Sequence, residues 1–175
     1  MADPPFSPQE LYKGHGWQIM KEEASLPDGR VKRTARAHRH DSVHILAFTQ
    51  DGNILMIREF RPFYHDFIWM VPSGKMDKEQ EPRVAAQREL QEETGFSAKT
   101  IEPYCRCRHS EILEQQNHIF IAHHLKPDPL PQDKNELIEL HEMPVSEAID
   151  RVLASSVIHT VSAFALLRYA REHGE

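Results

Sequence analysis

The sequence predicts an α+β fold in which a mixed β-sheet is sandwiched between helices (α/β/α), with an N-terminal β-hairpin extension. Two observations support this prediction. Segments with strand patterning come first along the chain, followed by one helical segment, another strand and two amphipathic helices, an order typical of layered α+β domains. The 175 residues also suffice for one domain with a proper core and are too few for two comfortable ones.

The composition is that of an ordinary globular protein, with 39% hydrophobic and 27% charged residues. A net charge of −6 argues against general attraction to nucleic acid or anionic membranes, so we expect neither as a partner. The N-terminal stretch MADPPFSPQELYKGHGW does not resemble a signal peptide, and no apolar run is long enough to span a bilayer. The two cysteines, Cys105 and Cys107, form neither a disulfide framework nor a zinc pattern. We therefore expect a cytoplasmic protein.

The N-terminal part is expected to consist of an arm and two strands. Residues 1–10 are rich in proline and are predicted to be a mobile arm. Residues 16–39 hold two strand-like runs around Pro27, Asp28 and Gly29, which is a good hairpin signal. The chain accordingly divides into two parts: residues 1–40 and residues 41–175.

Further strands are predicted at three places after residue 40. Residues 42–61 form two apolar runs on either side of Asp51 and Gly52, the strongest hairpin signal in the chain. A short apolar strand is predicted over residues 67–74 and another over residues 117–125.

Three helices are predicted. The first covers residues 82–94, because Pro82 suits the first helical turn and Gly95 suits the position just past the end. Two amphipathic helices close the chain, each marked by apolar residues at helical spacing. These residues are Ala148, Ile149, Val152 and Leu153 in one helix, and Ala163, Leu166, Leu167 and Ala170 in the other.

The stretch RELQEETGF places Glu89, Glu92 and Glu93 on one side of the first helix. Like charges at this spacing destabilise a helix by roughly 0.2–0.5 kcal/mol per pair, so the cluster is either a solvated face or has a function. The preceding loop offers backbone carbonyl groups, and Arg88 can hold a carboxylate through its fork of donors. Mg²⁺ takes such oxygen ligands, keeps several waters and completes its shell with substrate phosphates. The cluster therefore fits a hard-cation site.

Residues 74–96, GKMDKEQEPRVAAQRELQEETGF, resemble the Nudix box, G-x5-E-x7-R-E-U-x-E-E-x-G-U, in which U is a bulky aliphatic residue. The residues that match in register are Gly74, Arg88, Glu89, Leu90, Glu92, Glu93 and Gly95. One position departs from the box, because its first glutamate is Gln80 here, between Glu79 and Glu81. In the family that glutamate mostly supports the box arginine, and Gln80 can accept the same hydrogen bond without charge assistance.

The resemblance extends over roughly residues 17–170 and is strongest to the ADP-ribose and nucleoside-diphosphate-sugar pyrophosphatases. It implies a Nudix fold and hydrolysis of nucleoside diphosphate sugars, such as ADP-ribose, UDP-glucose or GDP-mannose, to nucleoside monophosphate and sugar phosphate. Three positions depart from the ADP-ribose enzymes: Met70 stands for a carboxylate, Ser110 for a proline and Lys134 for an acidic residue. These departures favour a broader nucleoside-diphosphate-sugar hydrolase over a strict ADP-ribose specialist.

The resemblance also implies a role for each matched residue. Glu89 and Glu93 would be the principal ligands of Mg²⁺ or Mn²⁺, with Glu92 on a further or shared ion. The backbone carbonyl of Ser73 would be another ligand. Glu136, in a loop expected to be mobile, would orient or deprotonate the attacking water or bind a catalytic ion. Together with Glu92 and Arg88, Glu136 makes up the expected catalytic set.

Substrate contacts are implied for Arg61 and Arg33, which match arginines that bind substrate phosphates in the family; the alternative for each is a surface salt bridge. Trp17 is one of several aromatic residues that could stack on the base. Relatives in this branch are generally homodimers whose N-terminal strands reach the partner's site. We therefore expect a homodimer, with residues 1–40 serving dimerisation and substrate binding.

Two other functions remain open. The chain could be a Nudix hydrolase of dinucleoside polyphosphates, nucleoside triphosphates or RNA ends, or a non-catalytic nucleotide-binding Nudix module. Retention of Glu89 and Glu93 disfavours the binding module. The strands before the box and the loop ending at Glu136 favour nucleoside diphosphate sugars over triphosphates.

Overall fold

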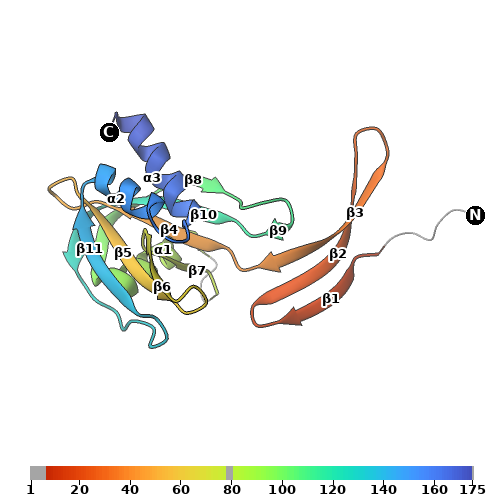
Figure 1. Cartoon of the computed structure of the whole chain (residues 1–175), viewed down its shortest axis with the longest axis horizontal. Coiled ribbons are helices and arrows are strands. Elements are labelled where there is room, and N and C mark those ends of the chain that lie inside the picture. Colours follow the sequence, from red (N-terminus) through yellow and green to blue (C-terminus); the bar gives the residue numbers. More distant parts are fainter. Residues whose placement is uncertain (1–6, 78–80, 175) are drawn as a thin grey trace, which may run out of the picture.

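The computed structural model describes residues 7–77 and 81–174, which form eleven strands and three helices (Figure 1). Two sheets build the body. The first sheet has the order β7-β4-β10-β8, from β4 (Ser42–Ala47), β7 (Ser73–Lys75), β8 (Phe96–Cys107) and β10 (Asn117–Pro127). In this sheet β10 runs parallel to β4 and antiparallel to β8, so the sheet is mixed as predicted. The second sheet is antiparallel, with the order β11-β5-β6, from β5 (Ile54–Arg61), β6 (Asp66–Met70) and β11 (Ile138–Met143).

Helices cover the body from two sides. The helices are α1 (Pro82–Thr94), α2 (Val145–Leu153) and α3 (Thr160–His173). Successive side chains of a strand point to opposite faces, and β4 serves both sides in this way. Ile45 belongs to one buried cluster with Leu90 of α1, whereas Leu46 belongs to another with Leu166 of α3. This arrangement confirms the predicted α+β fold with helices on both sides.

The predicted bounds of the first helix agree with the structure. Glu81 caps the N-terminus of α1 by accepting a hydrogen bond from the backbone N–H of Arg83 at 2.9 Å. Pro82 occupies the first turn, and Gly95 ends the helix in the left-handed conformation with φ of 76°. Both ends therefore follow from local chemistry. Within the described residues, no helix is long and apolar enough to cross a lipid bilayer.

The N-terminal extension is a three-stranded antiparallel sheet that projects away from the body (Figure 1). Its strands are β1 (Gln9–Gly14), β2 (Trp17–Ser25) and β3 (Val31–Arg39), with the short β9 (Leu113–Glu114) beside β3. The predicted turn is present, with Gly29 at φ of 84°. The prediction of a mobile arm over residues 1–10 is wrong at its end, because Gln9 and Glu10 pair with β2; residues 1–6 lie outside the described part.

The predicted hairpin over residues 42–61 is wrong in its pairing, although both of its strands exist. The edges of β4 are taken by β7 and β10, so β5 pairs with β6 and β11 instead. Next to the turn, the two runs are linked by the bridge of Phe48 with Ile54 and by a hydrogen bond from the Thr49 N–H to the Asn53 carbonyl at 2.9 Å. The sequence prediction also missed β8 and β11. The pairing of β8 with β10 is irregular at Pro103, which has no N–H to donate to the ladder. A proline inside this segment also weakens the sequence pattern by which a strand is predicted.

Candidate active site

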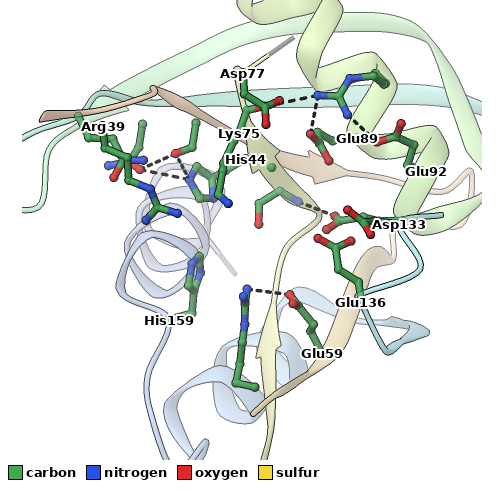
Figure 2. Close-up of a pocket in the computed structure, with 18 of the residues that line it drawn as sticks. Arg39, His44, Glu59, Lys75, Asp77, Glu89, Glu92, Asp133, Glu136 and His159 are labelled. Atoms are coloured by element: carbon green, nitrogen blue, oxygen red, sulfur yellow. Dashed lines mark hydrogen bonds and ion pairs between the residues drawn. The ribbon is translucent and has the colours of Figure 1, made fainter. Parts of the chain in front are cut away.

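A polar cavity of about 450 Å³ is lined by α1, both sheets of the body and the loop before β11. Figure 2 shows that most of its labelled carboxylates gather on one side, where Arg61 and Arg88 form ion pairs with some of them. The acidic side chains lie on one side: Glu59, Glu89, Glu92, Asp133 and Glu136. Arg39, His44 and His159 lie on the other side. The cavity can therefore present cation ligands and anion-binding groups to the two ends of one ligand.

The carboxylates of Glu89, Glu92 and Glu93 on α1 line this cavity. Glu89 and Glu93 are buried, at 8% and 7% exposure, on the side of α1 that faces the sheet. Arg88 binds two carboxylates at once, with 2.8 Å from its Nη2 to Glu89 Oε1 and 2.5 Å from its Nη1 to Glu92 Oε2. Since both contacts are charge-assisted, Arg88 fixes the directions of the neighbouring carboxylates.

Glu93 is anchored to the strand that carries Ser73. The backbone N–H of Ser73 donates to Glu93 Oε2 at 2.7 Å. Burial raises the pKa of Glu93 well above its ordinary value, against the opposing effect of this hydrogen bond. Burial likewise raises the pKa of Glu89 to about 7, with Arg88 opposing. Ionisation of these two buried carboxylates costs free energy, and a positive charge bound beside them would reduce that cost.

Gly74 leaves the room that Glu89 needs. A Cβ atom at position 74 would lie 1.9 Å from the carboxyl carbon of Glu89 and about as close to both of its oxygens. No side chain tolerates such an approach, so the Glu89 carboxylate can rest against β7 only if residue 74 is glycine. The first position of the box is explained by this contact.

Two further carboxylates complete the acidic side. Glu59, buried on β5, pairs with Arg61 at 2.7 Å, and burial raises its pKa. Burial, and then the charge of Asp133, raise the pKa of Glu136. The backbone N–H of Glu136 donates to the carbonyl of Asp133 at 3.1 Å, so a turn brings Glu136 to the cavity. Glu136 was predicted to lie here, whereas Glu59 was missed.

These oxygens fit a divalent cation that keeps much of its water. Among the described residues, no three acidic, histidine or cysteine side chains are close enough to form a ready-made metal cage. Mg²⁺ does not need one, because it is usually held by one or two carboxylates, water and substrate phosphates. Glu89 and Glu93 supply buried hard ligands, and Ser73, which anchors Glu93, is next to them.

We expect Mg²⁺ or Mn²⁺ to raise the melting temperature more at pH 8 than at pH 6. Protons compete with the cation for Glu89, whose pKa burial raises to about 7, and for Glu93, whose pKa burial also raises. A raised carboxylate pKa means that the folded state binds protons more tightly than the unfolded state. The free energy of unfolding of the metal-free protein therefore falls as the pH rises through 7. A bound cation restores it. Thermal melts at both pH values check this, and a metal effect independent of pH would contradict it.

The opposite side of the cavity holds neutral imidazoles that the sequence prediction missed. Asn117 donates from Nδ2 to the Cys107 carbonyl at 3.2 Å, which directs its Oδ1 toward Ser42 and His44. Ser42 donates its hydroxyl to that oxygen at 2.7 Å, so His44 must donate from Nε2. His44 Nδ1 is then a buried acceptor that finds no hydrogen-bond donor among the described residues. Burial lowers the pKa of His44 to about 3.

His159 lies beside His44, with 5.6 Å between the ring centroids. Its Nδ1 lies 2.7 Å from Ser162 Oγ, and burial lowers its pKa to about 4. Both rings therefore stay uncharged at neutral pH. A histidine within the buried strand SVHILA was the available sequence signal for His44, whereas nothing local distinguishes His159 from the other histidines.

The two predicted substrate arginines lie in different places. Arg61 lines the cavity, and Arg33 is in the projecting extension, 2.9 Å from Glu23, and does not line it. Trp17 stacks on Arg39 at 4.8 Å from the guanidinium carbon to the ring centroid. Gln80, at the position of the first box glutamate, lies outside the described residues.

Comparison with known proteins agrees with this geometry. The NUDIX domain model matches residues 38–161. An ADP-ribose pyrophosphatase of Bacillus subtilis is 28% identical over 90% of this chain and 87% of its own length. An ADP-ribose pyrophosphatase of Mycobacterium tuberculosis is 24% identical over 92% of this chain and 80% of its own.

Other matches differ in name or are more distant in sequence. A methanol dehydrogenase activator of Bacillus methanolicus is 24% identical over 90% of this chain and 87% of its own length. A crystal structure of an ADP compounds hydrolase superimposes with a TM-score of 0.76 over 96% of this chain and 94% of that one, at 20% identity. These findings confirm the predicted Nudix fold and the prediction of a pyrophosphohydrolase. The chain belongs to the NUDIX domain family.

Proposed function

We propose that this protein is a metal-dependent hydrolase that cleaves the pyrophosphate of nucleoside diphosphate sugars and releases nucleoside monophosphate and sugar phosphate. One observation carries the proposal: the buried pair Glu89 and Glu93 faces a cavity that also holds arginine side chains. This combination of cation ligands and phosphate-binding groups suits a diphosphate. The names of the relatives from Bacillus subtilis and Mycobacterium tuberculosis support the same substrate class.

The proposed roles are those that the family resemblance implies, and the placement of these residues at one cavity supports them. Glu89, Glu93 and the Ser73 carbonyl would hold Mg²⁺ or Mn²⁺, and Glu92 would contact a further or shared ion. When bound, the cation neutralises charge on the phosphate oxygens and lowers the pKa of water. Arg88 keeps Glu89 and Glu92 in place through its two ion pairs.

Glu136 is proposed to position the attacking water or accept its proton. Burial raises the pKa of its carboxyl group above the ordinary range, which makes it a better base than an exposed glutamate. Arg61 is proposed to bind substrate phosphate. To do so, the Arg61 guanidinium gives up some or all of its ion pair with Glu59 and binds the substrate phosphate instead.

A panel of substrates tests the proposal. Purified protein is incubated with Mg²⁺ or Mn²⁺ and ADP-ribose, UDP-glucose, GDP-mannose, a diadenosine polyphosphate or a nucleoside triphosphate, and the products are separated by chromatography. Nucleoside monophosphate from several of the sugars, with none after chelation, is the expected result. Release of pyrophosphate or phosphate from triphosphates alone would assign the protein to a different Nudix activity. Binding without turnover would support the binding module.

We also propose that the protein is a cytoplasmic homodimer joined through its N-terminal part, residues 1–40. Several apolar side chains of the projecting extension are exposed in the single chain, such as Leu11, Leu26 and Val31. Sedimentation at micromolar concentration is expected to show a dimer, and a variant lacking residues 1–16 should shift toward monomer. A monomeric full-length protein would contradict the proposal.

A further inference from the structure

Arg39 differs from the other arginines of the cavity in that no described residue forms an ion pair with it. Arg61 is paired with Glu59, and Arg88 with Glu89 and Glu92. Within the part of the chain that the structure describes, the guanidinium of Arg39 makes no hydrogen bond and no ion pair. Five N–H donors at the wall of a cavity are therefore left for a ligand.

The described residues beside Arg39 at this side of the cavity carry no negative charge that would compensate its own. Its neighbours on that side of the cavity in Figure 2 are His44 and His159, which are neutral at ordinary pH. Burial and then the positive charge of Arg61 lower the pKa of Arg39. Two guanidinium groups that repel each other across one cavity create a position where an anion would be stabilised by both.

Trp17 holds Arg39 in this position. The two residues are direct cross-strand partners in the ladder between β2 and β3. The indole lies under the guanidinium at 4.8 Å, a distance typical of a cation–π contact. This contact costs Arg39 none of its N–H donors, so the group is positioned and still able to bind. The N-terminal extension thus shapes the cavity of its own chain.

We propose that Arg39, positioned by Trp17, is a substrate-binding residue that grips a phosphate of the diphosphate together with Arg61. The inference rests on the proposed function and replaces Arg33 with a residue of the same strand that faces the cavity. It also means that both phosphate-binding arginines come from one chain. The partner chain in a dimer need not supply one.

The experiment compares Arg39→Gln, Arg39→Lys and the matched control Arg151→Gln, at an exposed arginine of α2 that pairs with Glu147 and does not line the cavity. For turnover of ADP-ribose and UDP-glucose, we expect Arg39→Gln to raise KM by roughly 10- to 100-fold with little change in kcat, as for loss of a charge-assisted contact made in both ground and transition states. Arg39→Lys should recover part of the loss. Trp17→Leu should show a smaller effect of the same kind, because it only releases the guanidinium. Arg151→Gln should resemble the unmodified protein.

Binding is measured separately by titration calorimetry with α,β-methylene-ADP, a diphosphate that cannot be hydrolysed at its bridge. Weaker binding by Arg39→Gln, with adenosine binding unchanged, supports the proposal even if no sugar is turned over; in that case only the proposed activity fails. Equal binding by Arg39→Gln and the unmodified protein would overturn it. An equal loss in Arg151→Gln would also overturn it, because removal of any positive charge would then weaken binding equally.

Discussion

Glu93→Gln is expected to lose most turnover while the protein stays folded. The glutamine oxygen can still accept the hydrogen bond from the Ser73 backbone, so the anchoring contact survives. The negative charge that would hold the cation is lost. If the cation supplies several kcal/mol of transition-state stabilisation, the rate falls by about 10³-fold or more, at about 1.4 kcal/mol per tenfold.

The same substitution should not destabilise the metal-free protein. Because burial raises the pKa of Glu93, its ionised form costs folding free energy at neutral pH, and a neutral side chain removes that cost. We expect an unchanged or higher melting temperature without metal, and a much smaller rise when Mg²⁺ is added. Glu102→Gln, an exposed change on β8, is the control and should leave both rate and melting unchanged. A near-normal rate for Glu93→Gln would remove Glu93 from the metal site.

Gly74→Ala is expected to have the second largest effect, through displacement of Glu89. The new methyl group would lie 1.9 Å from the carboxyl carbon of Glu89, so that carboxylate must move by an ångström or more. Misplacement by about 1 Å can cost roughly 10²-fold in rate. Since the displaced group is the end of a flexible side chain, we expect the rate to fall much more than the melting temperature.

Two further variants test whether the displaced carboxylate is the cause. Ser73→Ala keeps the backbone N–H that holds Glu93 and should stay active. Gly74→Ala combined with Glu89→Asp shortens the side chain that clashes, and should recover part of the rate lost in Gly74→Ala alone. Steady-state rates of all variants against ADP-ribose provide the measurement. If Glu89→Asp makes the defect worse, the space at Gly74 serves another purpose.

The sequence predicted best what local chemistry determines. The bounds of α1 follow from Pro82 and Gly95, which act on their own backbone. The grouping of Glu89 and Glu93 follows from helical spacing alone. The predicted convergence of these residues with Ser73 and Glu136 came from the family resemblance, and the structure places all four at one cavity.

Pairing between distant segments could not be predicted in the same way. The signal around Asp51 and Gly52 indicated a turn, but β4 pairs with a strand some 75 positions later, as Ser42 opposite Asn117 shows. Glu59 becomes a cavity residue only because β5 packs beside β4. Arg39 and Arg33 look alike in sequence, and only their places along β3 separate a cavity residue from an exposed one.

The parallel ladder between β4 and β10 has a consequence for how the protein is made. Its partners, such as Ser42 and Asn117, can meet only after the intervening segment has been synthesised and its loop has closed. His159 on the cavity wall emerges from the ribosome later still. A growing chain therefore contains α1 and its glutamates before the later residues that line the cavity have been synthesised. Ribosome-bound fragments ending before residue 117 should consequently fail to capture the cation or the nucleotide.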